Sequence, residues 1–282
     1  MRIGHMFWTA AVGIALSVPA RGREEKIKPE ELVAKHLASI GPAESLAAVS
    51  NRTVTGTTQL TFRLGGHGQL NGPASMVSEG RKVYIGMMFP ALEYRSDQFA
   101  FDGRGVEVSQ LAPGRRSQIG MIVYQNDFFL KEGLLGGAMT TAWALLDVAG
   151  RQPKMNYAGL RKLEGRQLHE LRYRARKGGG DFQIALYLEP ETYRHLYSTY
   201  RLVIPETMAS RPEASAGQQR TIVSLREEFS DFAAVDALTL PRSYKLILTI
   251  EGQRGSSITE WDFHAERILH SQVLEPGAFA LR

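Results

Sequence analysis

Apolar and polar residues alternate from Val54 to Leu64, and this pattern constrains the fold more than any other feature of the chain. The set on one side of the alternation is Val54, Gly56, Thr58, Leu60, Phe62 and Leu64. Because successive side chains of a strand point to opposite faces, the segment predicts a long strand with one buried face. Such a strand needs neighbours in a sheet, and residues 65–68 (Gly-Gly-His-Gly) predict a turn after it.

The same alternation, or a short apolar run between turn residues, recurs along most of the chain. Further strands are predicted at residues 82–89, 92–101, 106–111, 117–124, 160–163, 167–175, 182–188, 193–203, 221–229, 243–251 and 257–267. Turn-forming pairs such as Asp102-Gly103 and Pro113-Gly114 join them, as in an antiparallel meander. The polar residues from Pro205 to Gln219 predict a mobile loop. The pattern predicts an α+β fold on one antiparallel sheet of about eleven strands.

Two helices are predicted before the first strand. Pro29 suits the first turn of a helix and Gly41 suits its end, while residues 43–49 predict a second, short helix. One apolar stripe runs along the first helix and consists of Leu32, Val33, His36, Leu37 and Ile40.

Residues 128–150 interrupt the strands with a helical insert that is apolar on nearly all sides. Helical spacing relates Leu135, Met139, Ala142, Trp143 and Leu146, and the opposite side carries Leu134, Ala138 and Leu145. The pair Gly136-Gly137 predicts a division into two short helices or one bent helix. A helix of this composition has to be covered by protein or to face another apolar molecule.

The first twenty residues have the pattern of a secretory signal peptide. Arg2 precedes the apolar run from Met6 to Val18, and Pro19-Ala20 offers a cleavage site. The alternative, a membrane anchor, is disfavoured because the run is short for a bilayer span. We therefore expect export, with residues 1–20 as signal peptide, 21–28 as a flexible leader and 29–282 as one domain. The expected location is the periplasm, with no membrane span in the mature chain.

The chain has no cysteine and a net charge of +5. Without cysteine there is no disulfide, no thiolate-bound metal and no lipid-modified N-terminal cysteine, so we expect a stability based on a large noncovalent core. The basic residues are spread along the chain, and no stripe suited to nucleic acid stands out. We expect no nucleic-acid partner.

Recognisable catalytic patterns are missing from the sequence. The histidines show no metal-ligand spacing, and neither Gly-x-Ser-x-Gly nor Ser-x-x-Lys occurs, so we expect no catalytic residue, no metal and no cofactor. Two carboxylate pairs, Asp97 with Asp102 and Glu227 with Glu228, have the chemistry for acid–base catalysis, but solvated strand faces are the favoured interpretation.

Arg172, Arg174 and Arg176 lie on one face of a predicted strand. Two interpretations stay open: a face that meets an anionic headgroup, or an ordinary solvated face, which is the favoured one.

Three stretches carry a resemblance to a known family: Glu31–Gly41 followed by Val54–Thr57, Leu163–Arg166 with Tyr187–Tyr193, and Val235–Pro241. Together they resemble the periplasmic lipoprotein-carrier superfamily, the LolA/LolB-like or outer membrane lipoprotein-sorting proteins. The family usually has Gly where Ala237 stands, so this turn departs from its pattern.

The resemblance implies a curved half-barrel with helices over its concave face and an apolar cavity for acyl chains between them. Such a site needs pliable apolar walls. The candidate lipid-binding residues are Met87, Phe89, Leu134, Leu135, Met139, Trp143 and Leu146. An ordinary core position is an equally good interpretation of each one alone. Met87 and Met88 point to opposite faces, so at most one of them lines a cavity. The resemblance also implies a polar contact that holds the helical lid closed, which the sequence does not match to a residue.

The favoured function is that of a periplasmic carrier that holds acyl chains of lipids or lipoproteins and catalyses nothing. Two alternatives remain open. One is an envelope sensor or protein-interaction module on the same fold, with a sheet edge or the 205–219 loop as the contact; the other is a hydrolase on an unrecognised scaffold.

Overall fold

The computed structural model describes residues 27–205, 220–253 and 255–281. The predicted signal peptide (1–20), all but the last two residues of the predicted leader (21–28) and all but the first residue of the predicted loop (205–219) lie outside this part of the chain.

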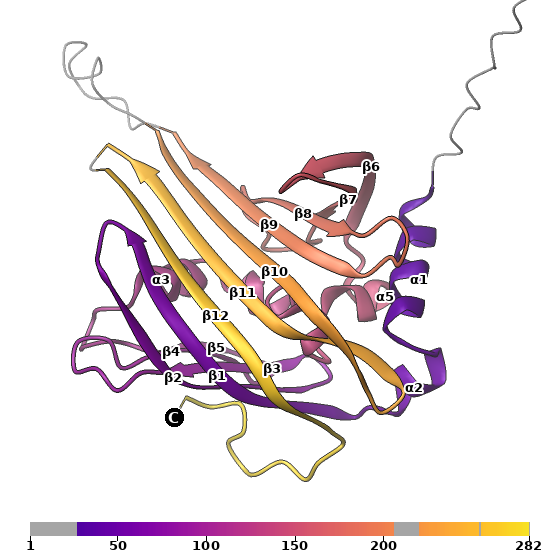
Figure 1. The fold of residues 1–282 in the computed structure, drawn as a ribbon, viewed down its shortest axis with the longest axis horizontal. Coiled ribbons are helices and arrows are strands. Elements are labelled where there is room, and N and C mark those ends of the chain that lie inside the picture. Colours follow the sequence, from indigo (N-terminus) through magenta and orange to yellow (C-terminus); the bar gives the residue numbers. More distant parts are fainter. Residues whose placement is uncertain (1–26, 206–219, 254, 282) are drawn as a thin grey trace, which may run out of the picture.

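One antiparallel sheet of 12 strands forms the frame of the molecule (Figure 1). From edge to edge the strands are β5 (Val106–Val108), β4 (Ser96–Phe101), β3 (Lys82–Met88), β2 (Gly68–Glu79), β1 (Asn51–Leu64), β12 (Gly255–His270), β11 (Leu238–Gly252), β10 (Thr221–Val235), β9 (His195–Ile204), β8 (Gln183–Leu188), β7 (Arg166–Arg174) and β6 (Lys154–Leu163). Among the described strands, only the β1–β12 pair joins strands that are distant in sequence, and it places the first strand beside the last. The predicted single antiparallel sheet is confirmed.

Two of the sequence-based strand predictions are wrong. Residues 68–79, predicted as no element, form β2, because Gly72 and Pro73 interrupt the alternation that its apolar positions would otherwise show. Residues 117–124, predicted as a strand, form the helix α3 (Gln118–Gln125) instead. The apolar residues Ile119, Ile122 and Val123 have helical spacing, and the Ser117 hydroxyl accepts a hydrogen bond from Gly120 N–H as an N-terminal cap.

Both predicted N-terminal helices are present, as α1 (Pro29–Ile40) and α2 (Ala43–Ala48). The apolar stripe of α1 is buried, including His36, except for the partly buried Leu37, and the helix ends before Gly41 as predicted. A side chain at Gly41 would collide with Leu238, so this glycine also lets α1 approach β11 closely.

The segment from Gln118 to Arg151, called the insert below, contains α3, α4 (Phe128–Lys131), α5 (Val148–Arg151) and two short 3₁₀ turns at Gly137–Met139 (η1) and Ala144–Asp147 (η2). The predicted break at the Gly136-Gly137 pair is confirmed. The helix predicted after the break is reduced to the two 3₁₀ turns, because the chain here follows the sheet closely. Figure 1 shows the sheet curving around these elements, which cover its concave face.

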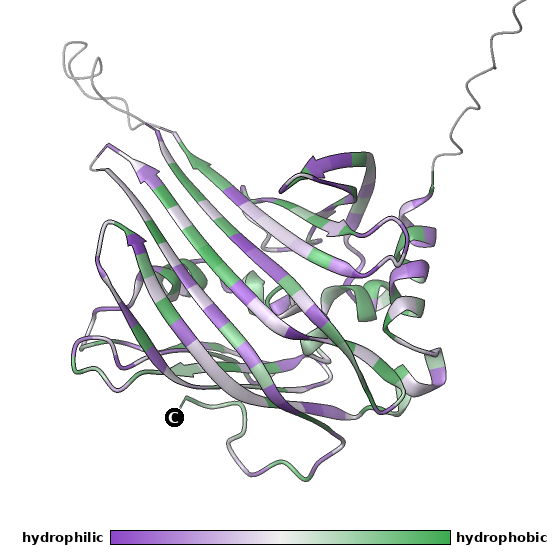
Figure 2. Ribbon diagram, viewed as in Figure 1, coloured by the Kyte–Doolittle hydropathy of each residue, from purple (hydrophilic) through white to green (hydrophobic). Residues whose placement is uncertain are grey.

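Strand residues alternate between a buried concave side and a more polar convex side, as the banding of the strands in Figure 2 shows. The concave side, α1 and the insert share one large apolar core. A second, small cluster lies where the C-terminal residues Ala278 and Phe279 pack against Val77, Tyr84 and Ala100 of β2, β3 and β4. Within the described residues, no helix is long and apolar enough to cross a membrane.

Candidate binding site beneath the insert

The structure brings the seven predicted lipid-binding residues together in one core beneath the insert. Met87 lies on β3 and Phe89 directly follows it; the others belong to the insert, and all except the partly buried Leu146 are at most 5% exposed. Met88, on the opposite face of β3, is 37% exposed, as the alternation predicts. The side chains that would contact an acyl chain therefore contact one another in this conformation.

Beneath residues 134–146 the space between the insert and the sheet is filled. A hollow beside Ala138 and His195 has a volume of about 10 Å³, which is room for one water molecule at most. Four larger hollows have volumes of 290 to 770 Å³, and three of them have no lining residue in the insert. The hollow of 290 Å³ lies at the start of the insert, where Gln118 lines it together with Phe62 and Trp261. An acyl chain can enter only if the insert moves.

Glu227 on β10 binds the insert from the middle of the concave face. Its side chain is fully buried, and its carboxylate accepts hydrogen bonds from Gly136 N–H at 2.8 Å and from the hydroxyls of Tyr244 and Tyr200 at 2.8 and 2.6 Å. Burial raises the pKa of Glu227 above its ordinary value, and these hydrogen bonds oppose the shift. Tyr200 Oη also lies 2.8 Å from the carbonyl oxygen of Leu134, so it has two acceptors for one proton.

The Gly136-Gly137 pair allows this close approach. Both residues have a positive φ, of 80° and 46°, a backbone conformation that glycine adopts without strain. A Cβ at Gly137 would lie 2.8 Å from the ring of Phe229 on β10. The glycines therefore serve the contact with the sheet as well as the break between helices.

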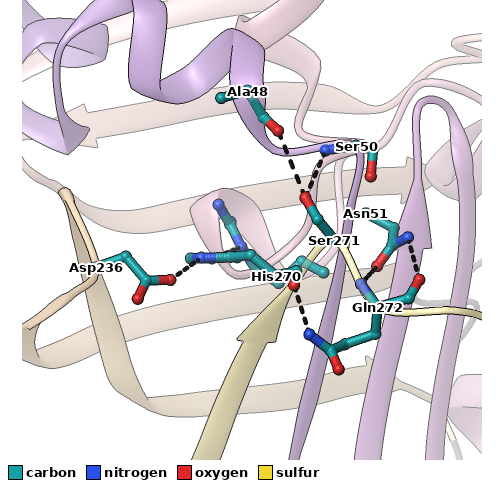
Figure 3. Close-up of polar contacts among 8 residues, drawn as sticks. Ala48, Ser50, Asn51, Asp236, His270, Ser271 and Gln272 are labelled. Carbon is teal, nitrogen blue, oxygen red and sulfur yellow. Dashed lines mark hydrogen bonds and ion pairs between the residues drawn. The ribbon is translucent and has the colours of Figure 1, made fainter.

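Arg52 on β1 binds the insert at a second point. It is 2% exposed, and its guanidinium donates a short hydrogen bond to the carbonyl oxygen of Ala138. Arg52 Nε donates to His270 Nε2 at 3.0 Å, and His270 Nδ1 contacts the Asp236 carboxylate at 2.8 Å (Figure 3). Since His270 Nε2 accepts from Arg52, its proton is on Nδ1 and is donated to Asp236. The imidazole thus links the exposed Asp236 to the buried arginine.

The surroundings of Arg52 are fixed by the junction between β1 and the end of β12. The side chain of Asn51 donates to the carbonyl of Gln272 and accepts from its N–H, at 2.8 and 3.0 Å, and Figure 3 shows this pair beside Ser271. Burial lowers the pKa of Arg52 to about 10, which leaves it charged at neutral pH. The structure thus holds a cation under the insert, aimed at a backbone carbonyl.

Two further polar contacts attach the insert to β2 and to α1. The Thr141 N–H donates to Ser78 Oγ on β2 at 2.8 Å. Trp143 Nε1 donates to His36 Nε2 on α1 at 3.1 Å, so the other nitrogen of His36 carries its proton and donates to the carbonyl of Tyr193 at 3.0 Å. Burial lowers the pKa of His36 to about 4, and this side chain is neutral at pH 7.

Asp97 anchors the start of the insert. It is 1% exposed and accepts hydrogen bonds from Tyr94 at 2.7 Å, from Trp261 on β12 at 2.8 Å and, at a short distance, from Ser117, the cap of α3. Burial raises the pKa of Asp97, while these three donors lower it.

The favoured interpretation of Asp97 and Glu227 as solvated strand residues is therefore wrong, whereas Asp102 is exposed as expected. Sequence reasoning also missed Arg52. The sequence did contain a signal for all three, because each lies two residues from an apolar, core-facing residue of its own strand. Arg52 shares a strand face with Val54, Asp97 with Phe99, and Glu227 with Leu225. A charged residue at a core-facing position of a strand is rarely buried without a specific partner.

No group of three or more His, Cys, Asp or Glu side chains suited to a metal ion occurs among the described residues. Asp97 and Glu227 each receive several hydrogen bonds, and neither lines one of the hollows described above. The polar groups beneath the insert bind backbone and neighbouring side chains of the same chain.

A curved antiparallel sheet with helices on its concave face is the architecture implied by the resemblance to the lipoprotein carriers, and this expectation is confirmed for the fold. No protein-family model matches the sequence, and no curated protein matches it.

Several solved structures are similar to the chain. They include a LolA superfamily protein from Nitrosomonas europaea (TM-score 0.49, 11% identity, 90% of this chain and 98% of that chain covered). A DUF1329 family protein from Desulfovibrio piger has a TM-score of 0.42 at 11% identity and the same coverage. A putative outer membrane lipoprotein-sorting protein domain from Vibrio parahaemolyticus has a TM-score of 0.42 at 11% identity, over 90% of this chain and 97% of that chain. At such similarities the function has to be argued from this chain's own residues.

Proposed function

We propose that this protein is a periplasmic, non-catalytic carrier of acyl chains, belonging to lipids or lipoproteins, and that the insert is its lid. The conformation described above is the closed one. Opening the insert would separate its apolar residues from the concave face and leave room for an acyl chain between them. The predicted lining residues Met87, Phe89, Leu134, Leu135, Met139, Trp143 and Leu146 would then be the cargo contacts.

One observation carries this proposal: side chains of the sheet form hydrogen bonds with the backbone of the insert. Between Leu134 and Thr141, four strands supply these contacts, through Tyr200, Glu227, Arg52 and Ser78. A permanent core gains little from a buried arginine and a buried glutamate that do not pair with each other, because both charges lose their hydration. Buried polar groups are better known for selecting one of several packed states, which is what a lid requires.

The energetics of exchange are compatible with such a carrier. Each CH₂ group buried contributes roughly 0.8 kcal/mol, so a long acyl chain can offset the apolar contacts that the insert loses on opening. The polar contacts would be broken on opening and re-formed on closing. They would thus set the rate of cargo exchange without adding to cargo affinity.

The experiment is native mass spectrometry of protein purified from the cell envelope under mild conditions. A carrier should retain co-purifying species with acyl-chain masses, and Glu227→Leu, which weakens the closed state, should speed their exchange with added fatty acid. A clean apo mass in repeated preparations, together with no uptake of added fatty acid, would count decisively against the proposal.

A second candidate is a protein-interaction module, and the filled interior is the observation that favours it. Such a module would use a sheet edge, and β6 is the longer of the two edge strands. Its ten residues include Lys154, Arg161 and Lys162, charges that discourage unspecific edge pairing but permit a specific partner. Pull-down from envelope extract with and without the substitution Lys162→Pro separates the two candidates, since only an edge partner would be lost.

A further inference from the structure

The charge of the molecule is concentrated in the four strands β6 to β9. Between Lys154 and Ile204 the sequence contains ten lysines and arginines but only five acidic residues, an excess equal to the net charge of +5 of the whole chain. The rest of the chain is balanced. These strands form one end of the sheet, at the upper right of Figure 1.

On the convex face of these strands, three of these cations form a row. Strand register places Lys154 opposite Arg174, and Gln183 opposite Arg201. All four side chains are exposed, and within the described residues the three cations make no ion pair. We call Lys154, Arg174 and Arg201 the basic row.

The neighbouring rows differ from the basic row. In the next row, Arg172 and Arg226 are already paired, with Glu170 at 2.8 Å and with Glu228 at 2.7 Å. Between these two arginines lie Ala185 and Thr199, whose short side chains leave a depression in the convex surface. The row beyond carries Tyr187 opposite Tyr197, both half-buried.

The result is a groove of 660 Å³ on the convex face, with Arg172, Arg174 and Arg201 among its lining residues and Glu170 and Asp181 as its acidic ones. A membrane interface is complementary to this surface, which combines a row of unpaired cations, a groove and a row of tyrosines. Anionic headgroups attract Lys and Arg side chains, and tyrosine rings favour the headgroup level.

From this arrangement we infer that the convex face of β6 to β9 docks on membranes that contain anionic phospholipid, with the phosphodiesters bound along the basic row. This docking does not rest on the proposed carriage of acyl chains, because the concave and convex faces are separate. If both hold, docking would place the carrier at the surface of a membrane.

The test is co-sedimentation with vesicles of phosphatidylcholine alone and of phosphatidylcholine with phosphatidylglycerol. We expect binding only to the second kind, and we expect 0.5 M salt to weaken it strongly. The double variant Arg174→Gln/Arg201→Gln should bind roughly thirty-fold more weakly, since each cation near an anionic surface contributes about 1 kcal/mol. Lys154→Gln alone should bind roughly five-fold more weakly.

The matched control is Arg104→Gln/Arg267→Gln, which removes the same charge from exposed positions outside β6 to β9. It should bind within about two-fold of the unaltered protein. Equal binding to both kinds of vesicle, no binding, or equal losses in the two double variants would overturn the inference. Displacement by millimolar glycerol phosphate at constant ionic strength would also overturn it, in favour of a site for a soluble phosphate. Acyl-chain uptake, measured in parallel, should be the same in all variants and so tests the proposed function separately.

Discussion

The buried carboxylate of Glu227 loses its hydration, and in return it holds the insert in place through hydrogen bonds. It accepts hydrogen bonds from the insert backbone and from two tyrosines, and no cation among the described residues lies within hydrogen-bond distance of it. Burial of an apolar side chain of similar size would cost less free energy. A buried, unpaired carboxylate is therefore explained by the structure that it holds in place. The same holds for Arg52, whose partner in the insert is a neutral carbonyl.

Substitution of Glu227 by leucine should lower the free energy of unfolding by about 3 kcal/mol, because Gly136 N–H and the Tyr244 hydroxyl lose their acceptor, whereas Tyr200 keeps the carbonyl oxygen of Leu134. Glu227→Gln, which keeps one carbonyl oxygen, should cost less than half as much. Denaturant unfolding followed by circular dichroism measures both. Equal costs for the two variants would show that the acceptor role is not what the carboxylate supplies.

His36 makes the closed state sensitive to acid. Its folded pKa of about 4 lies below the ordinary value of 6.5, so the unfolded chain takes up the proton first and stability is lost as the pH falls from about 6.5 to 4. Asp97 and Glu227 have raised pKa values and act in the opposite direction, because their stabilising contribution is full at low pH and is lost as the pH rises.

The contribution of His36 is therefore isolated by comparison with His36→Gln. Between pH 7 and pH 4 the unaltered protein should lose about 3 kcal/mol more unfolding free energy than the variant. Chemical denaturation at a series of pH values provides the two curves. If the curves run parallel, His36 is not the titrating group.

At the scale of elements, the insert is the part that sequence reasoning described least well. Its apolar character and its break at the glycine pair were predicted correctly, but α3 was taken for a strand. An eight-residue segment offers little more than two turns of periodicity, and helix and strand patterns are hard to separate at that length. The long strands were easier, because β1 shows many repeats of its alternation.

The contacts between the insert and the sheet could not be predicted from the sequence, for a different reason. Glu227 meets Gly136, and Arg52 meets Ala138, across more than 80 residues of chain. Parity shows that both side chains face the core, but only the register of the strands shows what they meet there. The second structural use of Gly137, its approach to Phe229, is hidden in the same way.

Gly137→Ala should loosen the insert without unfolding the sheet. The added Cβ would collide with the Phe229 ring and would strain a positive φ. Hydrogen–deuterium exchange should accelerate across Leu134–Leu146 by at least ten-fold, while β1 and β10–β12 remain protected.

The matched control is Gly165→Ala in the β6–β7 turn. Gly165 also has a positive φ, but a Cβ there meets nothing within 4 Å. This variant should lose about 1 kcal/mol from backbone strain alone and should leave exchange in the insert unchanged. Acceleration in both variants would mean that general destabilisation, and not the contact with Phe229, opens the insert.

At the scale of the whole molecule, we propose one role for each face of the sheet: acyl-chain binding on the concave face and membrane docking on the convex face. The concave face holds the insert over an apolar interior, and the convex face of β6 to β9 carries the unbalanced positive charge. The absence of cysteine suits this division, since no covalent link restricts the movement of the insert against the sheet. The stability of the closed state therefore depends on noncovalent contacts: apolar packing, the buried polar contacts and surface ion pairs such as Arg81–Asp147.

The same absence makes a direct test of the lid possible. Ser78→Cys combined with Thr141→Cys places a single pair of thiols where the insert meets β2, since Thr141 N lies 2.8 Å from Ser78 Oγ. Formation of the disulfide is verified by mass, and binding of a fluorescent fatty acid is measured before and after reduction. A carrier with a moving insert should bind the fatty acid only after reduction. Equal binding in the oxidised and reduced states, or no binding in either, would contradict it.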